Sequence, residues 1–329
     1  MAFVSIRDLR VAFDGVRVLH GIDLDIGKGE AIGLVGESGC GKSVTWLAAL
    51  GLLPGKARVE GSVTLDGQQL IGAPRSQLEQ IRGARIAMIF QDPSSSLNPV
   101  QRVGRQIGES LRLHRGLRGA QARTEVLRLM DMVGIPDAKR RIDLYPHEFS
   151  GGQCQRIMIA MALAGQPDLL IADEPTTALD ATIQAQILEL LSGIRRETGM
   201  ALVFISHDLG AVSAVCDRAA VMYAGRIVET NDIRSLFAAP AHPYTQGLLR
   251  AIPDIDASRA RLVPIEGTVP DPAALPTGCA FAPRCPRNSQ LCQNYAPDLK
   301  PQSAGGVVSC FYPVEADQTA MSQRQEVWA

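Results

Sequence analysis

Short, wholly apolar runs recur along the chain and are separated by stretches with helical periodicity. Three of these runs, Ala31–Val35, Leu169–Ala172 and Ala201–Ile205, predict strands that are buried on both faces of a parallel sheet. Ile22–Ile26 instead alternates apolar and polar residues, which predicts an antiparallel strand with one exposed face. Helical patterns such as Glu125–Met132 lie between the runs, and this combination is typical of an α/β fold.

The pattern changes in the last third of the chain. Arg218–Tyr223 and Arg226–Glu229 flank Ala224-Gly225, which predicts a β-hairpin. Residues 238–313 contain 12 of the 20 prolines, and because proline blocks helix interiors and central strands, this region should be rich in loops. Such a region buries too little apolar area to be stable alone, so it should dock on the rest of the chain or carry a cross-link.

Two glycine-rich strings carry the candidate chemistry. The first, Gly36–Ser43, has the spacing G-x-x-x-x-G-K-S and lies between a predicted strand and the helix-compatible stretch Val44–Leu50. In such a loop the backbone N–H groups turn onto phosphate oxygens, the lysine reaches the β- and γ-phosphates, and the serine hydroxyl binds Mg²⁺. The alternative is a glycine-rich turn with a chance lysine. The residues predicted to line this nucleotide site are Gly36, Glu37, Ser38, Gly39, Cys40, Gly41, Lys42, Ser43 and Val44.

The second string, SGGQ, precedes the apolar helical run Ile157–Ala164 and predicts another anion site at a helix start. Its members are Ser150, Gly151, Gly152 and Gln153. Taken alone, these residues could equally form a flexible turn. One nucleotide has no need of two such sites in one chain, whereas two chains packed head to tail do. Together the two strings resemble the ATP-binding subunits of ABC transporters, in which each serine closes over the γ-phosphate held by the other chain's lysine.

The resemblance assigns roles to residues at the ends of the apolar runs. Asp173 would hold Mg²⁺, and Glu174 would polarise or deprotonate the attacking water; the alternative is two exposed carboxylates in a turn. His207 matches the family's switch histidine, which contacts the γ-phosphate, although a lone histidine is more often structural. Gln91 ends the run Ile86–Phe90 and matches the glutamine that senses Mg²⁺ and the attacking water.

Two further positions have two interpretations each. Phe13 lies where the family places an aromatic ring on adenine, or it is a core residue. Asp180 matches the loop that crosses the dimer interface and also suits the N-cap of the helical run Ile183–Leu191. The expected ligands are ATP and Mg²⁺, although aromatic stacking does not by itself distinguish ATP from GTP.

The proline-rich region contains four of the seven cysteines, Cys279, Cys285, Cys292 and Cys310. Four thiolates suit a zinc ion or an iron–sulfur cluster, and their spacing does not decide between the two. Disulfides are disfavoured in a reducing cytoplasm. The surrounding residues resemble the C-terminal region of peptide-importer ATPases, some of which carry a 4Fe–4S cluster. The resemblance therefore favours that cluster over zinc, with unliganded buried cysteines as the third possibility.

Longer strings narrow the resemblance to the ATPases of oligopeptide, dipeptide and nickel importers: Gln91–Pro99, Tyr145–Phe149 and Ala241–Thr245. Met158–Leu163 and the four cysteines point to the D-type of the two ATPases that such importers use. The implied partners are a related F-type ATPase chain, two integral-membrane permeases and an extracytoplasmic substrate-binding protein. The implied function is ATP hydrolysis that energises the import of di- or oligopeptides, with nickel or another small solute as the alternative.

The resemblance also implies the fold, that of a P-loop NTPase with a RecA-like core, an antiparallel β subdomain, an inserted α-helical subdomain and a loop-rich C-terminal domain. The predicted nucleotide-binding domain covers residues 1–240, with the helical subdomain at about 92–164. The C-terminal domain covers residues 241–316 and contains the four-cysteine site. Residues 317–329 are expected to be disordered.

Composition argues against other classes of protein. With a formal charge of −1, the chain has no excess of basic residues of the kind that nucleic-acid-binding proteins use to contact phosphates. No apolar run approaches the roughly 18 residues of a membrane-spanning helix, and charged residues interrupt the N-terminal stretch before a signal peptide could form. We therefore expect a soluble protein at the cytoplasmic face of the inner membrane, bound there by its partners.

Two other ATPase functions are less well supported by the chain. The 59 positions from Gln91 to Ser150 are too few for the coiled-coil arms of DNA-repair ATPases that share this nucleotide head. A regulatory subunit that binds ATP without turnover would have no need of Glu174.

Overall fold

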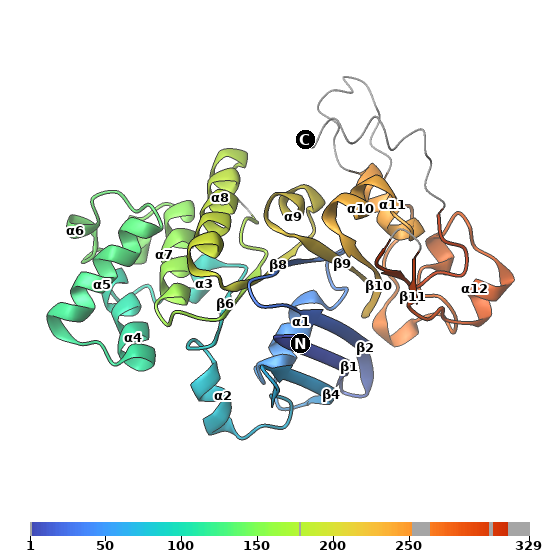
Figure 1. Ribbon diagram of the computed structural model, residues 1–329, viewed down its shortest axis with the longest axis horizontal. Helices are drawn as coiled ribbons and strands as arrows, with labels where there is room; N and C mark the ends of the chain where they lie inside the picture. Colours follow the sequence, from blue (N-terminus) through green and yellow to red (C-terminus); the bar gives the residue numbers. More distant parts are fainter. Residues whose placement is uncertain (1, 178, 252–263, 303–304, 315–329) are drawn as a thin grey trace. The chain divides into compact units, whose positions relative to one another are not determined.

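The computed structural model describes residues 2–177, 179–251, 264–302 and 305–314, with only the backbone of residues 94 and 95, and it forms two compact units (Figure 1). Unit 1 comprises Met1–Ile26, Ala31–Ile71 and Ser206–Ala329, and unit 2 comprises Gly27–Glu30 and Gly72–Ile205. The tail predicted to be disordered, residues 317–329, lies outside the described residues.

The first sheet of unit 1 is antiparallel, in the order β2-β1-β4-β5. It is formed by β1 (Val4–Phe13), β2 (Val16–Ile26), β4 (Ala57–Leu65) and β5 (Gln68–Gln69). Within β2, Ile22, Leu24 and Ile26 are buried while Asp23 and Asp25 are exposed, so the alternating pattern does produce a half-exposed antiparallel strand. Asp14-Gly15 closes the β1–β2 hairpin with positive φ at both residues, as a type I′ turn requires.

A second sheet of unit 1 runs in the order β11-β12-β10-β9-β3. The strand β3 (Ala31–Val35) is wholly buried and pairs in parallel with β9 (Arg218–Tyr223). An antiparallel hairpin through Ala224-Gly225 joins β9 to β10 (Arg226–Asp232), which confirms the predicted hairpin. The proline-rich region then adds β12 (Val307–Val308) to β10 and β11 (Lys300–Pro301) to β12.

The helices of unit 1 are short, and most of them belong to the C-terminal third of the chain. The first, α1 (Lys42–Ala49), follows β3, and α9 (Leu209–Val215) precedes β9. The remainder are α10 (Ile233–Ala238), α11 (Pro243–Arg250) and α12 (Gln290–Asn294), with single 3₁₀ turns at Pro272–Ala274 and Ala282–Arg284.

Unit 2 contains a parallel sheet in the order β8-β7-β6. Its strands are β6 (Ile86–Ile89), β7 (Leu169–Asp173) and β8 (Ala201–Ser206), of which Ser206 falls in unit 1. Every residue of β7 and β8 is buried, as expected for apolar runs that lie inside a parallel sheet. The long helix α8 (Ala181–Thr198) connects these two strands.

The rest of unit 2 is helical. Between β6 and β7 lie α3 (Pro93–Ser96), α4 (Val103–Arg115), α5 (Gly119–Met132), α6 (Ala138–Arg141), a 3₁₀ turn at Pro146–Glu148, and α7 (Gly151–Leu163); α2 (Arg75–Ile81) precedes β6. Figure 1 shows α4, α5, α6 and α7 gathered in one group, in green. On α4 the buried residues Val103, Ile107 and Leu111 recur every four positions and form its packed face.

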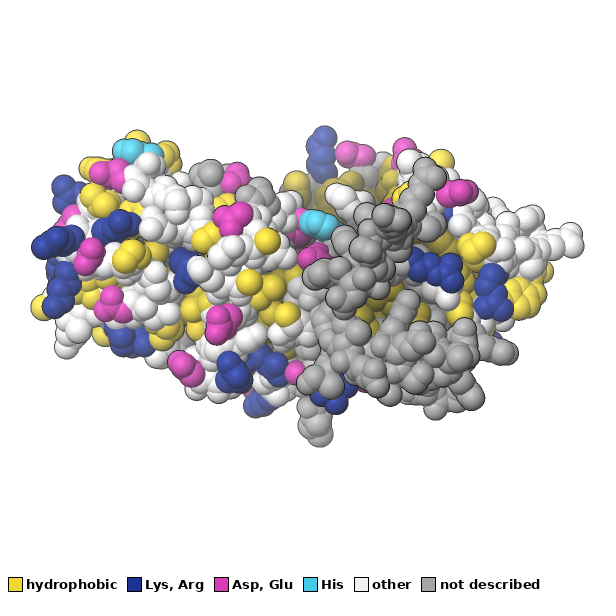
Figure 2. Space-filling view, turned by 90° about the horizontal axis from the view of Figure 1, so that it is seen from above, with side chains coloured by type: hydrophobic (Ala, Val, Ile, Leu, Met, Phe, Trp, Pro, Cys, Tyr) yellow, Lys and Arg dark blue, Asp and Glu magenta, His cyan; other side chains and the backbone are white. Residues whose placement is uncertain are grey.

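The surface agrees with the near-neutral composition. On the face seen in Figure 2, basic and acidic side chains are interspersed over the helices of unit 2. Among the described residues, no helix is both long enough and apolar enough to cross a bilayer.

Candidate active site

The glycine-rich loop of unit 1 connects the end of β3 to the start of α1, and its backbone conformation requires glycine at two positions. Gly36 has a φ of 156°, and a Cβ there would collide with the backbone oxygen of Met222. Gly41, the N-cap of α1, has a φ of 103°, and a Cβ there would lie 2.5 Å from Leu19 Cδ2. The loop is therefore folded tightly against β9 and β2, with its shape set by the glycines.

Lys42 is the first residue of α1 and is only 5% exposed. Its ammonium donates to the backbone oxygens of Gly36 at 2.7 Å and Glu37 at 3.1 Å. It also lies 3.9 Å from Cys40 Sγ, a long contact with a weak acceptor, so all three of its N–H donors point to groups of its own loop. The first bond of α1 runs from Thr45 N to Gly41 O at 3.0 Å, which leaves the amides of Lys42, Ser43 and Val44 without partners inside the helix. The loop thus presents several N–H groups and a cation, a combination that suits phosphate.

The other predicted residues of unit 1 lie at the ends of secondary-structure elements. Phe13 is half-buried and ends β1, directly before the Asp14-Gly15 turn. His207 is exposed and lies between β8 and α9, next to Asp208, which caps α9. Cys40 is 1% exposed within the loop, and burial raises the pKa of its thiol.

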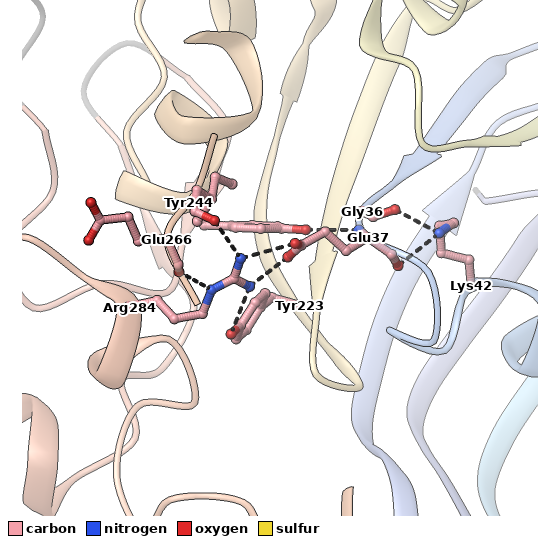
Figure 3. A network of polar contacts seen from close by, with 8 residues as sticks. Gly36, Glu37, Lys42, Tyr223, Tyr244, Glu266 and Arg284 are labelled. Atoms are coloured by element: carbon pink, nitrogen blue, oxygen red, sulfur yellow. Dashed lines mark hydrogen bonds and ion pairs between the residues drawn. The ribbon is translucent and has the colours of Figure 1, made fainter. Parts of the chain in front are cut away.

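Glu37 has partners that the sequence did not reveal (Figure 3). Its carboxylate accepts two hydrogen bonds from the guanidinium of Arg284, at 2.7 and 3.0 Å, and its backbone N–H donates to the Tyr244 hydroxyl at 2.9 Å. Arg284 is 247 positions away along the chain, and no local pattern links the two residues. Both partners come from the proline-rich region, which therefore contacts the phosphate loop directly.

In unit 2, the structure brings Gln91 and Glu174 together. The Gln91 side-chain amide donates to Glu174 Oε2 at 3.1 Å, and the Thr177 hydroxyl donates to the same oxygen at 2.9 Å. Asp173, one position earlier, is the last residue of β7 and is 7% exposed. Two donors on one carboxylate oxygen fix the orientation of Glu174. Thr177 is a site residue that sequence reasoning missed, since an isolated threonine in a turn carries no signal.

Glu174 also has an uncommon backbone conformation, with a φ of 47°. A non-glycine residue in the left-handed region costs on the order of 1 kcal/mol, and such residues gather at functional sites. The Glu174 amide donates to the backbone oxygen of Ile205 at 2.9 Å, which holds this turn at the end of the parallel sheet.

The SGGQ string forms the start of α7. Ser150 is the N-cap: its hydroxyl accepts from Gln153 N at 3.3 Å, while Gln153 Oε1 accepts from Ser150 N at 3.2 Å. This reciprocal pair is a capping box, and Arg141 donates to the same Gln153 oxygen at 3.3 Å. Ser150 and Gly151 are exposed and Gly152 is half-buried, so the N-terminus of α7 faces outward.

Asp180 lies at the corresponding place on α8. It is exposed, and its carboxylate accepts from Ile183 N at 3.0 Å, which confirms its predicted role as an N-cap. Its role at a dimer interface stays a prediction.

The prediction of a metal centre at the four cysteines is wrong. Cys279, Cys285, Cys292 and Cys310 do line one small cavity of unit 1, together with His242 and Phe281. Nevertheless, among the described residues no three His, Cys, Asp or Glu side chains are placed so that they could hold a metal ion. Nothing therefore supports a 4Fe–4S cluster or Zn²⁺ at these positions.

The thiols lie in surroundings that favour their protonated form. Burial raises the pKa of Cys279 and Cys285 and raises that of Cys310 to about 11. Cys292 lies in α12, and its sulfur is 3.4 Å from the hydroxyl of Ser289, the residue that caps this helix. The cysteines are free and half-buried or buried, which is the third of the possibilities left open by the sequence.

Comparison with known families gives two matches along the chain. Residues 19–177 match the family described as ABC transporter, and residues 228–292 match the family described as oligopeptide/dipeptide transporter, C-terminal region. The chain is 48% identical over 316 residues to the oligopeptide transport ATP-binding protein OppD of Salmonella typhimurium, an alignment that covers 95% of this chain and 94% of that protein. It is 48% identical over 314 residues to the dipeptide transport ATP-binding protein DppD of Bacillus subtilis, covering 94% of each.

Solved structures give matches of the same kind. The chain resembles cbiO1 from Clostridium perfringens, described as part of the ABC transporter complex cbiONQ, with a TM-score of 0.64 and 28% identity over 72% of this chain and 91% of that chain. It also resembles the ATP-binding cassette MJ0796, solved as a dimer bound to ADP and phosphate, with a TM-score of 0.63 and 26% identity over 70% of this chain and 98% of that chain.

Proposed function

This chain belongs to the ABC transporter family, among its oligopeptide and dipeptide transport ATP-binding proteins, and from that premise we propose that it hydrolyses ATP to drive the import of peptides. The observation that carries the proposal is the loop before α1, where the buried ammonium of Lys42 and the free amides of the first helical turn lie together. The relatives named for oligopeptide and dipeptide transport support peptides as the transported substrate.

In this proposal ATP binds with its phosphates on the loop and its adenine on Phe13. The residues proposed to form the ATP site at this loop are Gly36, Glu37, Ser38, Gly39, Cys40, Gly41, Lys42, Ser43 and Val44. Lys42 would exchange its long contact with Cys40 Sγ for a phosphate oxygen, and His207 would contact the γ-phosphate.

Three oxygen donors are proposed to hold the Mg²⁺ ion that accompanies ATP: Ser43, Gln91 and Asp173. Mg²⁺ prefers oxygen ligands, and the geometry of Gln91 is compatible with this role because its amide nitrogen is the atom bonded to Glu174. The bound ion would neutralise charge on the phosphates. Glu174, oriented by Gln91 and Thr177, would accept the proton of the attacking water.

A second ATPase chain completes each site in this proposal. Ser150, Gly151, Gly152 and Gln153 would contact the ATP held by the partner, and Asp180 would lie at the interface. The start of α7 supports this assignment, since Ser150 and Gly151 are exposed there. We propose that the partner is the related F-type chain rather than a second copy of this one.

The proposed assembly contains these two ATPases, two membrane permeases and a substrate-binding protein outside the membrane, with this chain at the cytoplasmic face. Within the chain, we propose a nucleotide-binding domain at residues 1–240, with a helical part at about 92–164 that faces the permeases, and a C-terminal domain at residues 241–316.

The test replaces the chromosomal copy by Glu174→Gln and measures uptake of a labelled dipeptide and a longer peptide. We expect uptake to be lost, and the purified variant should still bind ATP while its turnover falls at least about 100-fold, because the general base is missing. Glu197→Gln, on the exposed side of α8, is the matched control and should behave as the wild type. Normal turnover by Glu174→Gln would refute the assignment of the base, and normal peptide uptake would refute the transport function.

A further inference from the structure

Arg284 belongs to the proline-rich C-terminal region, is buried in unit 1 and contacts the phosphate loop through its side chain (Figure 3). Its side chain is only 4% exposed, yet it carries a full positive charge. Its Cζ atom lies 5.7 Å from the ring centre of Tyr223 and 5.9 Å from that of Phe281. Burying a guanidinium costs free energy unless its charge and its N–H groups have partners. The partners of Arg284 therefore indicate which groups this residue positions.

Those partners form a complete set. Arg284 donates to both carboxylate oxygens of Glu37, to the backbone oxygens of Glu266 at 2.9 Å and Ile265 at 3.4 Å, and to the Tyr223 hydroxyl at 3.4 Å. These five bonds equal the five N–H donors of a guanidinium. The bidentate pair with Glu37 raises the pKa of Arg284 further, so the residue is charged at every physiological pH.

The polar groups of Glu37 are engaged in turn. Its carboxylate binds Arg284, its N–H donates to Tyr244, and its backbone oxygen accepts from Lys42 at 3.1 Å. A continuous chain of contacts therefore runs from the C-terminal region through Glu37 to the lysine of the phosphate loop.

Tyr244 is itself held rigidly. It is fully buried, its ring meets those of Tyr223 and Phe281 at 4.7 and 5.4 Å, and burial raises the pKa of its hydroxyl. Its backbone N–H donates to His242 Nδ1 at 3.0 Å at the start of α11, and burial lowers the pKa of His242 to about 4, so the imidazole is neutral and can accept. The C-terminal region thus offers Glu37 two fixed contacts.

We propose that Arg284 is a positioning residue for ATP binding: it holds Glu37, and with it the Lys42 side of the phosphate loop, in the conformation that ATP requires. This inference rests on the proposed function. A loop that is already ordered loses less conformational entropy when the ligand binds, so the contact should appear as ATP affinity. Two effects of Arg284 must be separated, because it orients Glu37 and also neutralises a carboxylate close to where the triphosphate binds.

The experiment measures the dissociation constant and the stoichiometry of a fluorescent ATP analogue on the full-length chain. For Arg284→Gln we expect the dissociation constant to rise about tenfold, with the number of sites per molecule unchanged. Arg284→Lys keeps the charge but cannot form the bidentate pair, so it should also weaken binding. Arg287→Gln is the matched control: Arg287 lies in the same region, is exposed and donates to the backbone oxygen of Pro313.

The double variant Arg284→Gln/Glu37→Gln separates orientation from charge. Its net charge equals that of the wild type, so an effect of charge alone would restore wild-type affinity and overturn the proposal. If Arg284 orients the loop, affinity stays about tenfold weaker, because the contact is absent in both variants. A fall in the number of sites with an unchanged dissociation constant would also overturn it, since that result means partial unfolding.

Failure of the proposed function would look different. In that case the wild-type chain and Arg287→Gln would not bind the analogue, or Lys42→Ala would bind it as well as the wild type. If the wild type binds, Lys42→Ala does not, and Arg284→Gln has wild-type affinity, then the positioning role alone is refuted.

Discussion

Thr177 has a larger role at the residue scale than its place in a turn suggests. Its hydroxyl and the Gln91 amide both donate to Glu174 Oε2, and Glu174 itself has a left-handed backbone. In the proposed reaction Glu174 accepts a proton from water, which requires a fixed direction of its carboxylate, and these contacts provide that direction.

Replacing Thr177 by valine tests this contact. Valine has nearly the same shape and no hydroxyl, so Thr177→Val should lower kcat about tenfold, the effect of one lost orienting hydrogen bond, and leave the dissociation constant for ATP unchanged. Steady-state ATPase measurements on the assembled pair of ATPase chains would give kcat, and binding of a fluorescent ATP analogue would give the dissociation constant. Thr198→Val, whose hydroxyl bonds to Ile194 O at the end of α8, is the control. An unchanged kcat would mean that Gln91 alone orients Glu174.

Gly278 is the residue on which the local packing of the cysteine region depends. The backbone oxygen of Cys292 accepts from Cys279 N at 2.8 Å, and a Cβ on Gly278 would collide with that same oxygen and lie 2.6 Å from the backbone of Gln293. Backbone atoms cannot move aside as a side chain can, so Gly278→Ala should destabilise unit 1 by about 1–3 kcal/mol.

Thermal unfolding of the two glycine variants would measure this effect. Gly55→Ala is the control, because a Cβ on Gly55 meets nothing within 4 Å. If Gly278→Ala unfolds at the same temperature as Gly55→Ala, the packing around Cys292 is looser than described.

At the scale of elements, the pair α4–α5 is joined by a shared carboxylate. Glu125 on α5 accepts from Arg115 at the end of α4 at 2.6 Å and from Arg128 one turn along α5 at 2.9 Å. The hydrogen bond from Arg128, followed by that from Arg115, lowers the pKa of Glu125 to about 2. Because the folded pKa lies below the ordinary value, this contribution to stability is present above about pH 4.5 and is lost as the pH falls towards 2.

Glu125→Gln should therefore unfold at a lower temperature than the wild type near neutral pH, and the difference should shrink as the pH falls from about 4.5 towards 3. Thermal melts across this range would reveal it. Glu109→Gln, on the exposed side of α4, should show no such dependence. A constant difference at all values of pH would show that shape, rather than charge, holds the two helices together.

The elements that could be predicted from the sequence are those whose cause is local. The wholly apolar runs became β3, β7 and β8, and the alternating run became part of β2. Asp180 caps α8 as its position before an apolar run suggested. The contacts of Glu37 with Arg284 and Tyr244 could not be predicted, since they join positions more than 200 residues apart. The cysteine spacing led to a wrong prediction of a metal centre, because a sequence gives the number of thiols and not their arrangement in space.

On the scale of the whole molecule, the structure shows how the proline-rich region is held in place, which the composition alone did not determine. The sequence required either docking or a cross-link, and the structure shows docking within unit 1. The strand β12 pairs with β10, and Phe281 packs on Tyr223 and Tyr244. Aromatic packing and two strand pairs replace the metal centre that was expected there.

The contact between Arg284 and Glu37 limits how this region could be exchanged between proteins. A chimera that moves residues 264–314 onto another cassette would bury a guanidinium without its carboxylate unless a glutamate stands at the second position of the recipient's phosphate loop. The recipient would also need an aromatic ring where Tyr223 lies, at the end of β9. The C-terminal region therefore cannot be transferred to another protein by itself. In protein engineering and in gene fusion, this region and the phosphate loop have to be transferred together.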